Sequence, residues 1–124
     1  MAVQLNHTIV AVRDRWESAT FLTEVLGLAP PTTYGPFAVV ELSNGVSLDF
    51  IDDQKIHQRH YAVLVSEQEF DEILGRIRAR GLDFWADPFE QLPGEINTHD
   101  GGRGVYWCDP NGHKLEIITR PYGG

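Results

Sequence analysis

The sequence has little that could cross-link it or carry it into a membrane. Its 124 residues include one cysteine, Cys108, which excludes an intrachain disulfide and any multi-cysteine zinc or iron–sulfur site. No apolar run approaches the roughly 20 residues of a transmembrane helix, and the first residues lack the basic flank of a signal peptide. These absences predict a cytoplasmic protein with no membrane partner, in which Cys108 is structural.

Basic residues are also scarce. Ten Lys and Arg stand against eighteen Asp and Glu, which gives a formal net charge of −8. Nucleic-acid binding requires clustered basic side chains, so a nucleic-acid partner is not expected. With 42% of its residues hydrophobic, the chain can build a core of its own, and we expect 1–124 to form a single domain.

What the sequence does contain is an internal repeat. An offset of 53 residues brings His7–Val12 onto His60–Val65, which predicts that each half opens with a strand beginning near a histidine. An offset of 67 residues brings Asn44–Ile51 onto Asn111–Ile118, and both segments read Asn-Gly-x-x-Leu-acid-apolar-Ile. Each half is therefore expected to close with a strand that carries a carboxylate.

The two Asn-Gly pairs predict β-hairpins. Each pair lies between apolar runs, and a two-residue turn with both residues at positive φ is the tight hairpin connection that Asn-Gly favours. The expected strand pairs are Phe37–Leu42 with Val46–Ile51 and Val105–Cys108 with His113–Thr119.

An amphipathic helix is predicted after the opening strand of each half. Asp14 is the expected N-cap of the first helix, which ends at Gly27, while Ser66 and Glu69 form a capping-box pattern for the second. The apolar faces consist of Phe21, Leu22, Val25 and Leu26 in the first helix and of Phe70, Ile73, Leu74 and Ile77 in the second.

Weak strands near Thr32–Tyr34 and Asp83–Ala86 complete the order β-α-β-β-β in each half. The predicted fold class is α+β, with two βαβββ modules, about 1–53 and about 58–121, that form a curved mixed sheet around a cleft. The larger second offset leaves about 14 extra residues in the second half, most of them in the loop Asp87–Gly102. A loop inserted in one copy only is a candidate for specificity.

Four ionisable residues occupy equivalent positions in the repeat. His7 and His60 begin the opening strands, and Asp49 and Glu116 lie in the closing strands. Two imidazoles with one or two carboxylates form a site suited to Fe, Mn, Co, Ni or Zn, and two histidines with one carboxylate leave coordination positions open for a substrate.

The chain resembles a known family, the vicinal oxygen chelate superfamily. That superfamily includes glyoxalase I, extradiol dioxygenases, fosfomycin-resistance proteins and bleomycin-resistance binding proteins. The similar segments are Leu5-Asn6-His7-x-x-x-Ala11-Val12 for the opening strand and Gly104-Val-Tyr106-Trp-x-Asp109-Pro-Asn-Gly-His-x-Leu115-Glu116 for the closing hairpin. The resemblance implies a fold built around a metal cleft, and it implies a homodimer, which can exchange modules.

The resemblance also implies functions for individual residues. It makes His7, His60 and Glu116 the ligands of a divalent metal, with His7 contributed either by the same chain or by a partner chain. Asp49 matches the position of a fourth ligand, but it is one methylene shorter than the family's glutamate, so a ligand, a proton-accepting base and a solvent-facing side chain all remain open. His99 or Tyr106 could act beside bound oxygen.

Several further residues are candidates for substrate binding. Arg103 lies in the Gly-rich loop, where it could clamp a carboxylate or phosphate of the substrate or pair with a neighbouring acid. Trp85 and Trp107 could line an apolar pocket or pack in the core. His57 and His113 are expected at the surface.

Two classes of function follow. The first is a metal-dependent enzyme that chelates two neighbouring oxygens of a small substrate, with isomerase or lyase chemistry slightly favoured by Asp49 over ring-cleaving dioxygenase chemistry or epoxide opening. The second is a binding protein of the bleomycin-resistance kind, which sequesters a small aromatic or cationic compound without catalysis. Retention of all three candidate ligands favours the enzyme.

Overall fold

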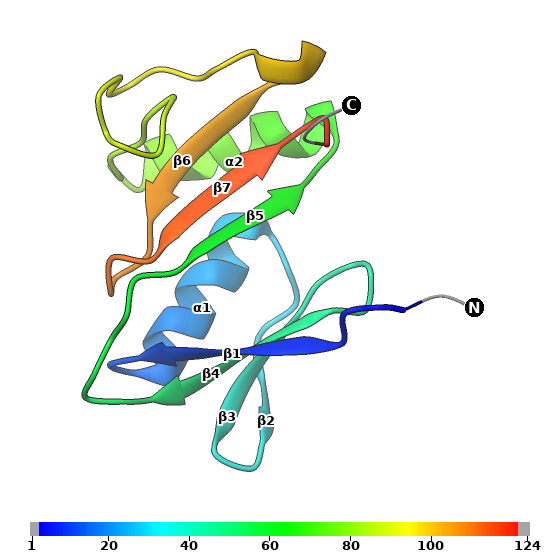
Figure 1. The fold of residues 1–124 in the computed structure, drawn as a ribbon, viewed down its shortest axis with the longest axis vertical. Coiled ribbons are helices and arrows are strands. Elements are labelled where there is room, and N and C mark those ends of the chain that lie inside the picture. The colour runs from blue at the N-terminus through cyan, green and yellow to red at the C-terminus, as the bar shows by residue number, and fades with distance from the viewer. Residues whose placement is uncertain (1–2, 122–124) are drawn as a thin grey trace. The chain divides into compact units, whose positions relative to one another are not determined.

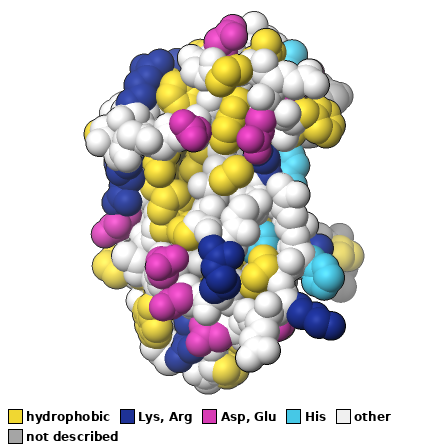
Figure 2. Space-filling model, turned by 90° about the vertical axis from the view of Figure 1, so that its left-hand side faces the viewer, with side chains coloured by type: hydrophobic (Ala, Val, Ile, Leu, Met, Phe, Trp, Pro, Cys, Tyr) yellow, Lys and Arg dark blue, Asp and Glu magenta, His cyan; other side chains and the backbone are white. Residues whose placement is uncertain are grey.

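A computed structural model describes residues 3–121 of the chain. It divides into two compact units, Met1–His57 and Gln58–Gly124, and each unit is described by itself. No helix among the described residues is long and apolar enough to cross a membrane. Acidic and basic side chains are interspersed over the face drawn in Figure 2, among exposed hydrophobic ones.

Unit 1 is a four-stranded mixed sheet with one helix. Its elements are β1 (His7–Val12), α1 (Arg15–Leu26), β2 (Thr32–Tyr34), β3 (Phe37–Glu41) and β4 (Ser47–Asp52). The sheet order is β1-β4-β3-β2, in which β1 runs parallel to β4 and the other pairs are antiparallel. Helix α1 packs on one face of this sheet (Figure 1).

Local signals fix α1 and the side of the sheet that it covers. The Asp14 side chain accepts hydrogen bonds from the backbone N–H groups of Trp16 and Glu17, and Gly27 ends the helix at a φ of 74°. Alternation along the strands sends Val10, Val12, Val40, Leu48 and Phe50 into the core. The residues between them face the opposite side of the sheet.

Unit 2 repeats this plan with a smaller sheet. Its elements are β5 (His60–Leu64), α2 (Glu67–Ala79), the 3-10 turn η1 (His99–Gly101), β6 (Gly104–Cys108) and β7 (Lys114–Ile118). The order is β5-β7-β6, with β5 parallel to β7 and β6 antiparallel to it. The predicted α+β class is confirmed, with one mixed sheet in each unit.

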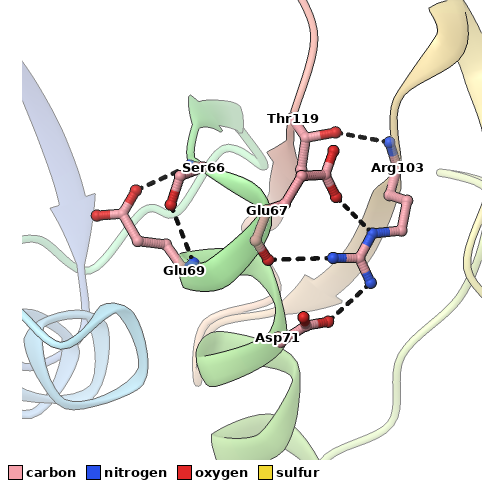
Figure 3. Close-up of polar contacts among 6 residues, drawn as sticks. All are labelled: Ser66, Glu67, Glu69, Asp71, Arg103 and Thr119. Carbon is pink, nitrogen blue, oxygen red and sulfur yellow. Dashed lines mark hydrogen bonds and ion pairs between the residues drawn. The ribbon is translucent and has the colours of Figure 1, made fainter.

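Helix α2 forms as its sequence predicts. Ser66 accepts a hydrogen bond from the Glu69 backbone N–H, and the Glu69 carboxylate accepts one from the Ser66 N–H, so the capping box is complete (Figure 3). The four predicted apolar residues of this helix, Phe70, Ile73, Leu74 and Ile77, are all buried.

The weak strand near Asp83–Ala86 was predicted wrongly, whereas Thr32–Tyr34 forms as β2. Within Asp83–Ala86, Trp85 forms isolated bridges to Tyr106 and to Pro93, and neither bridge extends into a strand. The hydrogen bonds beside the Pro93 bridge run from the Gly94 N–H to the Phe84 carbonyl and from the Ala86 N–H to the Leu92 carbonyl.

The hairpins form, but their turns are longer than expected. Gly45 donates to the Leu42 carbonyl, and Gly112 donates to the Asp109 carbonyl in the equivalent turn. Both glycines have positive φ, whereas Asn44 and Asn111 do not, since Glu90 and Asp100 are the only non-glycine residues with positive φ in the described chain. A three-residue loop needs only one left-handed residue, which the glycine supplies.

Candidate active site

The register of the unit 2 sheet places three candidate residues on one face. Ala62 and Tyr106 lie on either side of Glu116 in the ladder, while His60 pairs with Lys114 two residues before Glu116. Because side chains two apart on a strand point the same way, His60, Tyr106, Lys114 and Glu116 share the face opposite the buried Val105, Leu115 and Ile117.

On this face, His60 and Glu116 form a close pair. Their Nε2 and Oε1 atoms are 2.9 Å apart, the Glu116 side chain is 1% exposed and the His60 side chain is 44% exposed. The ring of Tyr106 lies 5.7 Å from that of His60, between centroids. A carboxylate so deeply buried requires hydrogen bonds or a cation. The pair therefore offers one nitrogen and one oxygen donor atom on this face of the sheet.

His7 lies at the start of β1 in unit 1, and its side chain is oriented by its neighbour. Its Nδ1 atom is 2.7 Å from the Asn6 side-chain oxygen. Because that oxygen only accepts hydrogen bonds, the ring proton belongs on Nδ1, which leaves the Nε2 lone pair for a ligand. This is the arrangement expected of a metal-binding imidazole.

Asp49 and His7 line the same groove in unit 1. The groove has a volume of about 480 Å³, and its apolar walls include Ile9, Tyr34, Phe37 and Val39. Asp49 is buried, and its Oδ1 atom accepts a hydrogen bond of 2.8 Å from the Ser47 hydroxyl. The Ser47 contact was not anticipated from sequence, although its spacing of two residues along a strand would have suggested it.

A divalent metal fits the donors that these residues offer. His60 Nε2 and Glu116 Oε1 face one another, and one imidazole with one carboxylate is part of a borderline-to-hard donor set. Within residues 3–121, however, no three His, Cys, Asp or Glu side chains are grouped to hold a metal. The third predicted ligand, His7, belongs to the other unit.

Lys114 is a buried cation on the same face as Glu116, and sequence reasoning missed it. Its Nζ atom lies 2.8 Å from the Glu90 carboxylate and 4.7 Å from the centre of the Trp85 ring. Burial lowers the pKa of Lys114, but its contacts with Glu90 and Cys108 outweigh burial and raise that pKa above the ordinary value. Trp85 thus lies on the candidate face, as its bridge to Tyr106 requires.

Arg103, in contrast, points to the helix side of the sheet. Its guanidinium donates to the Glu67 and Asp71 carboxylates at 2.8 Å each and to the Glu67 carbonyl (Figure 3). The guanidinium also lies over the Phe70 ring. Of the two interpretations of Arg103, pairing with neighbouring acids is the one that the structure shows. Its face is the one opposite Tyr106.

Trp107 and His113 are both buried, at 1% exposure each. The Trp107 side chain points to the helix-facing side of β6, so it packs in the core rather than lining a pocket. The surface assignment of His113 was wrong, because its Nδ1 atom accepts a hydrogen bond from the Arg59 backbone N–H and ties the start of β5 to the hairpin. His57 is exposed as predicted.

His99 follows the end of the sheet that is farther from the His60–Glu116 pair. It begins η1, two residues after Asn97, whose backbone pairs with Gly104 at the start of β6. Gly104 pairs with Ile118, whereas His60 pairs with Lys114 at the other end of β7. Of the two residues predicted to act beside bound oxygen, Tyr106 is the one that neighbours the pair.

The chain matches a known protein family. Residues 4–117 match the family model described as the Glyoxalase/Bleomycin resistance protein/Dioxygenase superfamily. The chain belongs to this superfamily, the vicinal oxygen chelate superfamily.

Similar members of the superfamily bear the names of enzymes. The solved structure titled "Oxidase ChaP-H1" is 64% identical with a TM-score of 0.97, covering 99% of this chain and 100% of that one. "Oxidase ChaP-H2" is 61% identical, also with a TM-score of 0.97, over 100% and 98% of the two chains. "Glutathione transferase FosA" from Serratia marcescens is 31% identical, over 94% of this chain and 81% of that protein.

Proposed function

We propose that this protein is a divalent-metal-dependent oxidase that uses dioxygen to oxidise a small aromatic compound with two neighbouring oxygen atoms. The observation that carries the proposal is the 64% identity to Oxidase ChaP-H1 over almost the whole of both chains. Sequence reasoning slightly favoured isomerase or lyase chemistry, and this likeness is the reason to prefer oxidation among the reaction types that the family offers.

His7, His60 and Glu116 would hold the metal. Two imidazoles and one carboxylate suit Fe, Mn, Co, Ni or Zn and leave positions open for a bidentate substrate. A bound divalent ion would supply Lewis-acid chemistry, which lowers the pKa of neighbouring substrate oxygens. The hydrogen bond of His7 to Asn6 and the burial of Glu116 restrict the motion of these side chains, which supports their assignment as ligands.

Asp49 would accept the proton that the substrate loses. Its Oδ1 atom accepts a hydrogen bond from the Ser47 hydroxyl, so Oδ2 would be the carboxylate oxygen that takes the proton. The apolar side chains that line the groove beside Asp49 would offer aromatic surface to a planar ring. Tyr106 would hold the His60 ring in place through their contact.

The substrate is therefore expected to be a small aromatic molecule, and a homodimer is the expected assembly. A panel of aromatic compounds with two neighbouring oxygens, tested with an oxygen electrode, would identify substrates by metal-dependent oxygen uptake. Loss of uptake in His60→Ala and Glu116→Gln, with uptake retained in His57→Ala, is the expected result. His57 is the matched control because it is an exposed histidine outside the strands.

The competing function is that of a binding protein. It would be supported if the purified protein bound an aromatic ligand without metal and without oxygen uptake, and if His60→Ala left that binding unchanged. Such a result would contradict the oxidase proposal.

A further inference from the structure

Lys114 is unusual because burying a charged side chain at its position costs free energy. The strands β5, β6 and β7 contain one Lys and no Arg, and the Lys114 side chain is only 6% exposed. Burying an ammonium group costs free energy unless it is paired. An apolar residue would fill the same space at no such cost, which suggests that the charge itself is used.

The partner of Lys114 comes from the loop that distinguishes unit 2 from unit 1. Glu90 reaches Lys114 Nζ at 2.8 Å, although its own side chain is 49% exposed. Its backbone has a φ of 61°, a left-handed conformation that non-glycine residues seldom adopt. Glu90 is thus held in an unfavourable conformation with its carboxylate on the buried ammonium.

Asp87 explains how the loop maintains this conformation. Its carboxylate accepts hydrogen bonds from the backbone N–H groups of Phe89, Gln91 and Leu92. The turn is therefore ordered by Asp87, independently of the Glu90 side chain. Glu90 can leave Lys114 by rotation of its own side chain while the turn stays folded.

We propose that Lys114 and the Trp85 ring form a subsite for an anionic oxygen of the substrate, which the Glu90 carboxylate occupies in the free protein. The ammonium supplies the charge, and the Trp85 ring, 4.7 Å from it, supplies a flat apolar wall. This inference rests on the proposed function, and it narrows the substrate to an aromatic compound with a carboxylate or phenolate.

The spacing along β7 suits such a substrate. Lys114 and Glu116 are two residues apart on the same face, so their Cα atoms are separated by about 7 Å. That separation is comparable to the length of a substituted aromatic ring. A ring whose neighbouring oxygens lie at the His60–Glu116 end would direct an acidic substituent toward Lys114.

The test uses benzoate as an anionic aromatic probe and benzamide as its neutral match. Each is titrated by calorimetry into the purified full-length protein, before and after EDTA treatment. Glu90→Gln is expected to tighten benzoate binding about tenfold, which is the gain when a competing group that occupied the site nine-tenths of the time is removed. Benzamide binding is expected to stay constant, as is benzoate binding in the control Glu95→Gln, which removes an exposed charge from the same loop.

Lys114→Met in the Glu90→Gln background is expected to abolish the gain for benzoate. Lys114→Gln serves the same purpose if the methionine variant does not fold, and circular dichroism checks both. Benzoate affinity that is unchanged in Glu90→Gln would overturn the proposal, as would benzoate binding that EDTA removes from every variant. Because the expected binding survives EDTA and needs no turnover, it can succeed or fail independently of metal-dependent oxidation.

Discussion

His60 Nε2 lies 2.9 Å from Oε1 of Glu116, a carboxylate that is 1% exposed. Their strands are adjacent in the sheet, but the two residues are 56 positions apart in the chain. The parallel pairing of β5 with β7 is therefore what assembles the pair. Because an unpaired buried carboxylate is costly, Glu116 needs hydrogen-bond partners or a cation, and His60 is one such partner.

Asp49→Asn separates the functions that the sequence left open for Asp49. If Asp49 accepts a proton, the substitution keeps the metal content and lowers kcat for oxygen uptake by roughly 10²-fold or more. Metal analysis and steady-state kinetics check this together. Loss of the metal would make Asp49 a ligand, and unchanged kcat would remove it from the mechanism.

Arg103→Met is expected to affect stability alone. The ion pairs with Glu67 and Asp71 are exposed on their acidic side and contribute little, whereas the contact over the Phe70 ring is worth about 1 kcal/mol. The melting temperature should fall by about 4 °C, with metal content and KM unchanged. A raised KM at full metal content would instead support the substrate clamp.

Glu67, which pairs with Arg103, makes the stability of the protein depend on pH. A hydrogen bond from the Thr119 side chain, followed by one from Arg103, holds the pKa of Glu67 below its ordinary value. Its stabilising effect is therefore fully present above the unfolded pKa of about 4.3 and is lost as the pH falls through the lower folded pKa.

Urea unfolding of the wild type and Glu67→Gln at a series of pH values measures this effect. The difference in the free energy of unfolding should be largest above about pH 5 and should vanish at lower pH. A difference that grows as the pH falls would have the wrong sign for this account.

Gly104→Ala tests how tightly the inserted loop is attached to β6. A Cβ at Gly104 would lie 2.8 Å from Asn97 Oδ1, and Asn97 in turn donates to the Ala86 carbonyl. Overpacking of this kind costs about 1–3 kcal/mol, measurable by urea unfolding. Gly75→Ala is the matched control, because Gly75 lies in α2 with open space at its Cβ position, and it should stabilise the protein by about 0.5–1 kcal/mol.

Local patterns account for the parts of the fold that sequence predicts well. The Ser66–Glu69 capping box, the N-cap at Asp14 and the glycines of the two hairpins act over a few residues, so they can be identified in the chain directly. The internal repeat then predicts the order of elements. The same repeat singled out His60 and Glu116 because they hold equivalent positions to His7 and Asp49.

Features that depend on register or on distant partners were not predictable. For Trp107, a pocket and the core both remained open, because alternation does not say which face of the strand α2 covers. His113 was expected at the surface, but it is buried and accepts a hydrogen bond from a backbone N–H 54 positions away in the chain. Glu90 and Lys114 are 24 residues apart, and no local signal connects them.

Metal stoichiometry tests the central claim most directly. Inductively coupled plasma mass spectrometry of the purified protein should find close to one divalent transition-metal ion per chain, and His7→Ala, His60→Ala and Glu116→Gln should each lose it while His57→Ala retains it. A folded wild-type protein that takes up no metal when supplied with Fe(II), Mn(II), Co(II), Ni(II) or Zn(II) would contradict the account.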